Sequence, residues 1–190
     1  MGYNEYWEQI YSISEELNSL ITAYWDDYSN LSSWQFWVVL FIMIIPLVIL
    51  YFTVDRQRIF ELFFFGFIVH MLWSYCDTIL SLYKYFVHTY FLTPLLPYAQ
   101  NMTTSLLPVS FILLYQYCTK HKKNFYLYTL FLSAFFALLG TPIEEYFGFV
   151  KFDKGLLPLH IFFIDVAIAY IAYWGTKFVL SLNQRSEKNK

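Results

Sequence analysis

Residues 34–53 have the sequence WQFWVVLFIMIIPLVILYFT, which contains no charged residue. About 20 residues that rise 1.5 Å each in an α-helix cover a hydrocarbon core of about 30 Å. Trp34 and Trp37 stand at the start of the stretch, where aromatic residues anchor helices at the membrane interface. Pro46 lies in its interior and predicts a kink. The stretch therefore predicts a transmembrane helix and an integral membrane protein.

The composition of the whole chain agrees with this interpretation. Of its 190 residues, 58% are hydrophobic, 24% aromatic and only 14% charged, whereas a soluble domain carries about 25% charged residues. No block of basic residues is present, so we expect no nucleic-acid partner. Cys76 and Cys118 occur in no metal-binding or CxxC spacing, and we expect no cofactor.

Four further apolar stretches follow, and the expected fold class is an all-α membrane protein with a bundle of about five transmembrane helices. The expected spans are 34–53, 59–80, 102–118, 125–140 and 156–182. Residues 81–101 are interrupted by charged residues and prolines, so we expect an interfacial loop or a re-entrant piece there. Residues 183–190 form a polar tail.

Residues 1–31 precede the first span and predict an amphipathic helix outside the cytoplasm. Apolar and aromatic residues recur at helical spacing: Tyr6, Ile10, Leu17, Ile21, Tyr24 and Tyr28. Six carboxylates and no lysine or arginine accompany them: Glu5, Glu8, Glu15, Glu16, Asp26 and Asp27. We expect this helix to lie along the lipid bilayer interface. A sharper interpretation is that it docks a membrane-protein partner or collects cations.

The orientation follows from the distribution of lysine and arginine, which favours the cytoplasmic side. With the N-terminus outside and the C-terminus in the cytoplasm, nine of the 12 basic residues are cytoplasmic. Lys84, Lys151 and Lys154 are then the basic residues outside. We therefore expect a multi-pass protein of the bacterial plasma membrane in this orientation.

Two local polar features concern the ends of the first two spans. Ser32 and Gln35 have the spacing of a capping box and predict the start of the first helix. Glu61 lies one turn inside the second span, close to Arg56 and Arg58. We expect an ion pair that orients the turn between these spans.

A set of ionisable and polar residues falls within or beside the spans, where a charge costs about 2.5–3.5 kcal/mol at the helix centre. His70, Ser74 and Asp77 are four and three residues apart and share one face of the second span. His160 and Asp165 are five apart and face different directions on the last span. The expected topology brings most of the set towards the outer half of the membrane. The complete candidate set is His70, Ser74, Asp77, Glu144, Glu145, His160 and Asp165.

Three interpretations of this candidate set remain open. The side chains fix helix packing through hydrogen bonds, they form a cation or proton pathway, or they form a catalytic or metal site. No HExxH, GxSxG or paired-cysteine motif supports the third interpretation.

The order of motifs over residues 34–180 also allows a comparison with known families. It comprises Trp34, Trp37 and Pro46, then VDRQR at 54–58 with Glu61, then Gly66, Asp77, Tyr90, Pro108 and the YQY of 115–117 before a basic turn. This order resembles a family of small, uncharacterised multi-pass membrane proteins of Bacillus-like, spore-forming bacteria. The chain departs from that family at Thr141, where a glutamate is expected before the proline. The resemblance implies the topology and carries no activity.

The leading functional hypothesis is therefore a non-enzymatic structural or accessory component of the cell envelope or spore membrane. The first alternative is a small proton or cation transporter or channel subunit that uses His70, Asp77 and Asp165. The second alternative is a membrane-embedded enzyme that acts on lipid or peptide at the outer leaflet.

Overall fold

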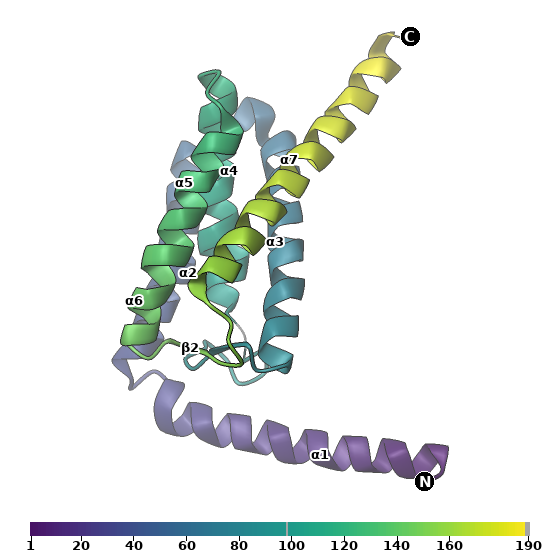
Figure 1. Ribbon diagram of the computed structural model, residues 1–190, viewed down its shortest axis with the longest axis vertical. Helices are drawn as coiled ribbons and strands as arrows, with labels where there is room; N and C mark the ends of the chain where they lie inside the picture. Colours follow the sequence, from purple (N-terminus) through teal and green to yellow (C-terminus); the bar gives the residue numbers. More distant parts are fainter. Residues whose placement is uncertain (98, 189–190) are drawn as a thin grey trace.

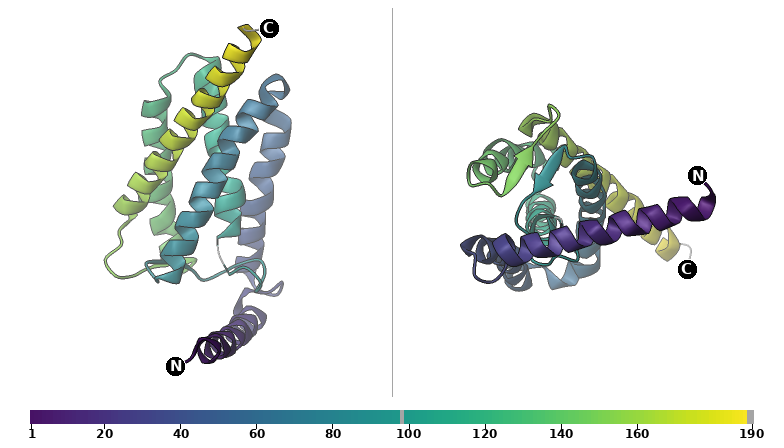
Figure 2. Two further views of the ribbon diagram at one scale, coloured as in Figure 1. Left: turned by 90° about the vertical axis from the view of Figure 1, so that its right-hand side faces the viewer. Right: turned by 90° about the horizontal axis from the view of Figure 1, so that it is seen from below.

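The computed structural model describes residues 1–97 and 99–188 of the chain, and it is mainly helical (Figure 1). The helical segments of the bundle lie side by side along its long axis (Figures 1 and 2). They are α2 (Trp34–Thr53), α3 (Ile59–Leu82), η3 with α4 (Asn101–Leu106 and Leu107–Lys120), α5 with η4 and α6 (Phe125–Ala134, Phe135–Gly140 and Thr141–Tyr146), and α7 (Pro158–Lys188).

Four of these helical segments are long and apolar enough to cross a membrane: Trp34–Thr53, Arg56–Leu82, Phe125–Tyr146 and Pro158–Leu182. The outward surfaces of these segments are apolar, as in helices that face lipid. Phe52 is 77% exposed and Phe60 90% exposed. A multi-pass membrane protein is therefore the class that the fold supports.

The segment η3–α4 differs from the expectation of about five spans, because it is not among those four apolar segments. Its sequence carries several polar residues, including Thr103, Thr104 and Gln116. The segment also lies at the centre of the bundle, where Phe111 and Tyr115 are fully buried. A helix enclosed by other helices needs no lipid-compatible surface, so its mean hydropathy falls.

Aromatic stacking holds the core around α4. The rings of Phe65 on α3 and Tyr115 on α4 stack with centroids 4.6 Å apart. Phe125 on α5 and Tyr173 on α7 stack at the same centroid distance. Edge-to-face contacts connect the two pairs, so one aromatic cluster joins α3, α4, α5 and α7.

The helix α2 begins one residue later than the capping box predicts. Ser33, not Ser32, is its N-cap and accepts a hydrogen bond from the backbone N–H of Phe36. The backbone N–H and the hydroxyl of Ser32 both donate to Oδ1 of Asn30, so Ser32 is engaged in an Asx turn. Gln35 donates to the hydroxyl of Tyr90. The predicted Ser32–Gln35 capping box is therefore wrong.

The turn between α2 and α3 contains the predicted ion pair. After the short helix η2 (Arg56–Arg58), the guanidinium of Arg58 donates two hydrogen bonds to the carboxylate of Glu61, at 3.0 and 2.7 Å. The hydroxyl of Tyr115 donates to the same carboxylate. The local ion pair at Glu61 is thus confirmed, with Arg58 as its basic partner.

The expected loop at 81–101 is shorter in the structure, because α3 extends to Leu82 and η3 begins at Asn101, and its described residues contain a short strand. Strand β1 (Phe86–His88) pairs antiparallel with β2 (Val150–Phe152), and Val87 faces Lys151 in the register. Two positive-φ residues, Lys84 and Lys154, make the adjoining turns. The pairing joins the α3–η3 loop to the α6–α7 loop at one end of the bundle (Figure 2).

Two π-helical segments interrupt the bundle helices directly before prolines. The N–H of Leu107 bonds to the carbonyl of Met102, and the N–H of Thr141 bonds to that of Phe136. In each case the next residue is a proline, which lacks an N–H and clashes with the preceding turn. The wider turn relieves the clash, and such π turns are frequent at functional sites.

The N-terminal segment forms α1 (Tyr3–Tyr24) and η1 (Trp25–Ser29), which lie across the end of the bundle that carries the strands (Figures 1 and 2). No residue of α1 is buried. Its C-terminal end is tied to the loop after β1, because Trp25 and Ser29 both donate to the carbonyl of Phe91.

At the other end of the chain, α7 continues to Lys188 instead of giving way to a separate tail at residue 183. No glycine or proline lies between 183 and 188 to end the helix. Residues 189–190 of the predicted tail lie outside the described residues.

Candidate functional site

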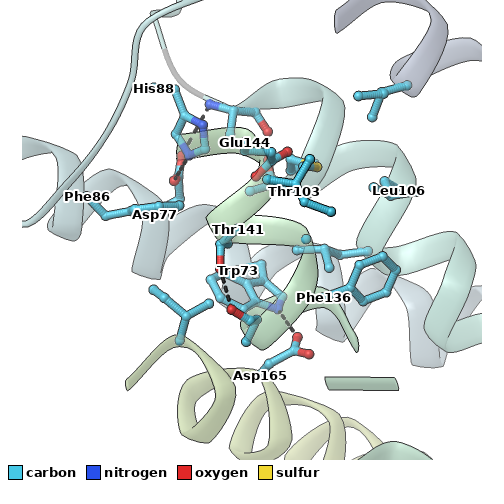
Figure 3. Close-up of a pocket in the computed structure, with 18 of the residues that line it drawn as sticks. Trp73, Asp77, Phe86, His88, Thr103, Leu106, Phe136, Thr141, Glu144 and Asp165 are labelled. Carbon is cyan, nitrogen blue, oxygen red and sulfur yellow. Dashed lines mark hydrogen bonds and ion pairs between the residues drawn. The ribbon is translucent and has the colours of Figure 1, made fainter. Parts of the chain in front are cut away.

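A cavity of about 270 Å³ lies inside the half of the bundle that carries the strands (Figure 3). Most of its lining is apolar and comes from α2, α3, η3, η4 and α7. Both π-helical segments contribute to the wall, through Met102 and Leu106 of η3 and Phe136 and Ala137 of η4. A small group of polar side chains faces the same space: Trp73, Asp77, His88, Thr103, Thr141, Glu144 and Asp165.

A second cavity of about 280 Å³ adjoins the first and reaches the surface between α2 and α6. Trp34 and Val38 of α2 form one wall, and Phe147 after α6 lies on the other. Four residues line both cavities: Ile42, His88, Ile143 and Glu144. We call the two cavities together the α2–α6 groove. It is an apolar space with an acid and an imidazole at the junction of its two parts.

Asp77 and His88 form a buried pair at one end of the first cavity. Nε2 of His88 lies 3.1 Å from Oδ1 of Asp77, and both side chains are less than a tenth exposed. The backbone N–H of Ala99 donates to the other carboxylate oxygen at 3.3 Å. Asp77 sits near the end of α3, so the strand β1 and the loop to η3 both fold back onto this carboxylate (Figure 3).

Glu144 lies at the junction of the two cavities, in the first turn of α6. It is half-buried, and its carboxylate makes no hydrogen bond or ion pair with the described residues. Thr141 and Pro142 begin α6 and place Glu144 one turn from the π segment η4. A carboxylate without a partner at the head of an apolar groove is suited to a ligand that carries a hydrogen-bond donor or a positive charge.

Asp165 on α7 lies deeper, at the opposite end of the first cavity from His88 (Figure 3). It is 1% exposed. The indole N–H of Trp73 donates to its Oδ1 at 2.9 Å. Its Oδ2 has no hydrogen-bond partner among the described residues.

The other predicted residues do not meet this site. Nδ1 of His70 donates to the carbonyl of Thr103 at 2.8 Å, and the hydroxyl of Ser74 lies 3.4 Å from the same nitrogen. Because a carbonyl only accepts, Nδ1 carries the proton. The bond of His70 connects α3 to η3, and Ser74 lies beside the His70 ring on the same helix.

His160 and Glu145 lie outside the cavity. His160 is exposed, and its Nδ1 accepts the backbone N–H of Leu157 at 2.9 Å, which caps the start of α7. Glu145 is exposed beside Glu144. The structure therefore brings together Asp77, Glu144 and Asp165 from the predicted set, with the first and the last at opposite ends of one cavity.

Sequence reasoning did not select His88, Trp73 or Thr141. His88 stood in a segment interpreted as a loop, and only its pairing with β2 brings it to Asp77. Trp73 lies on an apolar helix, where its sequence position does not indicate a polar contact. Its indole N–H nevertheless needs a hydrogen-bond partner when it is buried.

A metal centre of the usual kind is not formed by these residues. Within the described part of the chain, no three His, Cys, Asp or Glu side chains gather closely enough to hold a metal ion together. The arrangement instead offers hydrogen-bond acceptors at two depths of an apolar space. Comparisons with protein-family models, with curated proteins and with solved structures gave no match to this chain.

Proposed function

We propose that the protein is a non-enzymatic component of the bacterial plasma membrane that binds an amphipathic, lipid-like molecule in the α2–α6 groove. One observation carries the proposal: two apolar cavities of about 270 and 280 Å³ meet at His88 and at Glu144, whose carboxylate has no partner among the residues that the structure describes. The resemblance to uncharacterised multi-pass membrane proteins of Bacillus-like, spore-forming bacteria stays a prediction. An accessory role in the cell envelope or spore membrane is compatible with a binding component.

The groove separates the roles of the two parts of such a ligand. An acyl chain that moves from lipid into an apolar cavity gains little transfer energy, because both surroundings are apolar. Packing against Ile42 and Phe136 fixes the chain, whereas affinity and selectivity come from the head. A head with N–H, O–H or ammonium groups pairs with Glu144, and its desolvation is compensated there.

The experiment that tests binding is native mass spectrometry of the protein released from nanodiscs of bacterial lipid extract. We expect a retained amphiphile in the unmodified protein and a clear loss of it in Gly140→Leu. Gly140 lines the cavity, and a Cβ there meets only the carbonyl oxygen of Phe135 at 3.7 Å, so the side chain has room to fill the space.

A matched pair of variants tests the head group. Glu144→Gln removes the charge at the junction, and Glu145→Gln makes the same change at the exposed neighbour. We expect the first variant to change the identity or amount of the retained molecule and the second to leave both unchanged. Equal retention in the unmodified protein, Gly140→Leu and Glu144→Gln would refute the proposed groove.

We further propose that the bundle crosses the membrane five times, with η3–α4 as the fifth span. Asn101–Leu106 and Leu107–Lys120 together have the length of a hydrocarbon core, and this segment is shielded by the other helices. Arg56, Arg58 and the lysines of 120–123 belong to the end opposite α1 (Figure 1). The positive-inside rule then supports a cytoplasmic C-terminus and an outer N-terminus.

Single-cysteine labelling of intact cells tests this topology in a background without Cys76 and Cys118. We expect Leu20→Cys and Tyr146→Cys to react with an impermeant reagent and Ser186→Cys to react only after lysis. Leu20 and Tyr146 are well exposed, at 63% and 85%. Labelling of all three positions from outside would exclude an odd number of spans.

In this orientation we place α1 in the outer interface, parallel to the membrane plane. Tyr3, Trp7 and Tyr11 form a row of contacting rings along the exposed helix, and aromatic rings favour the interface. Docking of a membrane-protein partner on α1 is a second role for the same helix. Deletion of residues 1–30 tests it, because a bound partner would no longer co-purify.

A proton or cation pathway is the second candidate function, and the observation in its favour is that Asp77, Glu144 and Asp165 line one cavity. Carboxylates within membrane spans commonly mark such pathways. If this function holds, Asp77→Asn abolishes ion-dependent flux in liposomes while the variant remains folded. Unchanged flux in that variant would remove the candidate.

A further inference from the structure

The hydroxyl groups of Thr129 and Ser133 on α5 lack a bond that many threonines in the helical segments form. Eight threonines in helical segments donate to the carbonyl four residues earlier: Thr22, Thr53, Thr78, Thr103, Thr104, Thr119, Thr141 and Thr176. This bond is the usual way to satisfy a hydroxyl in an apolar helix. Thr129 and Ser133 do not form it, and both hydroxyls are buried without a partner among the described residues.

These two hydroxyls lie on one face of α5, because residues four apart meet on the same side of a helix. The helix α5 packs against both α4 and α7. The hydroxyl of Ser133 lies beside the carboxyl group of Asp165, whose Oδ2 is the third buried oxygen without a partner in the same part of the chain. Ser133 and Asp165 thus place two of these oxygen atoms between α5 and α7, and Thr129 adds a third one turn away on the same face of α5. Each of the three could accept a further bond.

The charge of Asp165 needs compensation at this depth. The carboxylate is 1% exposed, and its bond from the indole of Trp73 stabilises the ionised form. An ionised carboxylate in an apolar interior is costly unless a positive charge is nearby. No lysine, arginine or histidine of the described residues forms an ion pair with it.

We infer that Asp165, Ser133 and Thr129 bind one small monovalent cation of the Na⁺ type between α5 and α7. Hard cations prefer carboxylate, hydroxyl and carbonyl oxygens, and these are the groups whose bonds are unfulfilled here. A monovalent ion balances the single carboxylate, whereas a divalent ion would leave a net charge in the apolar interior. The cavity that Asp165 lines provides the route of entry from its outer end.

The proposed cation site is distinct from the amphiphile site in the groove. The inference of cation binding does not depend on whether the protein transports ions. Cation binding stabilises the folded protein by mass action, without any other ligand. A failure to retain an amphiphile in nanodiscs would therefore leave the cation result unchanged, and the reverse also applies.

The test is the melting temperature of the purified full-length protein in detergent, followed by tryptophan fluorescence while NaCl replaces choline chloride at constant ionic strength. We expect a saturable rise on the order of 3–10 °C in Na⁺, which corresponds to concentrations of about 10–100 times Kd. Parallel titrations with K⁺ establish the ion preference.

Variants assign the effect to these oxygens. Asp165→Asn removes the charge at nearly constant shape and is expected to abolish the Na⁺ shift. Ser133→Ala and Thr129→Ala, which keep the carboxylate, are expected to require several-fold more Na⁺ and remain informative if Asp165→Asn does not fold. Thr176→Ala is the control, because that hydroxyl donates to the carbonyl of Ala172.

Two results would overturn the inference. The first is the absence of any difference between choline and Na⁺ or K⁺ in the unmodified protein, or a Na⁺ shift of unchanged size in Asp165→Asn. The second is a melting temperature that rises on acidification with no cation effect, which would mean that a proton compensates the carboxylate. Asp77, His88 and Glu144 line the same cavity, so the acidification series must be repeated in Asp165→Asn.

Discussion

A glycine-to-alanine change at Gly66 provides a quantitative test of how tightly α3 packs against the central helix α4. A Cβ at this position would lie 2.3 Å from Cδ1 and 2.6 Å from Cγ1 of Ile112. Carbon atoms in contact are normally about 3.5–4.0 Å apart, so the isoleucine must move by about 1 Å or more. Ile112 is 4% exposed, so any movement takes place within the packed interior.

The geometry of isoleucine decides the size of the effect. Rotation about χ2 can move Cδ1 away, but Cγ1 is fixed by χ1, which is strongly restricted for isoleucine in a helix. Overpacking of this kind costs about 1–3 kcal/mol. Alanine otherwise stabilises a helix interior by about 1 kcal/mol relative to glycine. We therefore expect Gly66→Ala to lower the free energy of unfolding by up to about 2 kcal/mol.

Gly175→Ala on α7 is the matched control. A Cβ there meets only the terminal Cδ1 of Ile68, at 3.2 Å. That atom can move by a few tenths of an ångström through χ2 rotation, so the gain in helix propensity prevails. We expect Gly175→Ala to be neutral or up to about 1 kcal/mol more stable. The same substitution should thus lower the free energy of unfolding more at Gly66 than at Gly175.

Thermal unfolding in detergent measures both variants, and about 2–4 °C in Tm corresponds to 1 kcal/mol for a chain of this size. A double-mutant cycle with Ile112→Ala adds a stricter test. If the clash is real, Gly66→Ala should cost much less in that background, with a coupling energy of about 1–2 kcal/mol. Additive effects, or a Gly66→Ala protein as stable as Gly175→Ala, would refute the proposed α3–α4 packing.

Two further predictions use matched neighbours at the ends of helices. Arg58→Met removes the bidentate partner of Glu61 and should destabilise the protein by about 1–2 kcal/mol, since the pair is only partly exposed to solvent. Arg56→Met should change the melting temperature little. Equal effects of the two variants would contradict the assignment of Arg58 as the partner. Ser33→Ala removes the N-cap of α2 and should lower the free energy of unfolding by about 1 kcal/mol in the same assay. Ser32→Ala should lower it less, because that side chain caps no helix. A larger loss of stability in Ser32→Ala would show that the cap is misassigned.

Much of the helical organisation could be predicted because apolar stretches and their charged breaks are local features. The helix Trp34–Thr53 has the same bounds as the first apolar stretch. The choice between two adjacent serines was beyond this reasoning, since it depends on Asn30, whose side chain engages Ser32. The polar sequence of α4 likewise reflects its enclosure by other helices, which only the assembled bundle reveals.

The candidate site could be predicted in part. Asp77 and Asp165 stand out as carboxylates within apolar stretches, and both line the cavity. The partner of Asp77 is His88, which reaches it through a strand whose pairing residues are far away in sequence. The prolines at 108 and 142 were visible in the sequence, but the π turns before them follow from backbone geometry that residue type alone does not specify.

The pairing of β1 with β2 also has a consequence for the order of events during biosynthesis. Lys151 follows Val87 by 64 residues, so at about 5–20 residues per second β2 leaves the ribosome roughly 3–13 s after β1. During this interval the edge of β1 that later pairs with β2 has no partner strand. An unpaired edge is satisfied by water and not by lipid. The nascent chain must therefore keep β1 in the aqueous phase until α5 and α6 have been inserted. The pairing of β1 with β2 then joins the first half of the bundle to the second half.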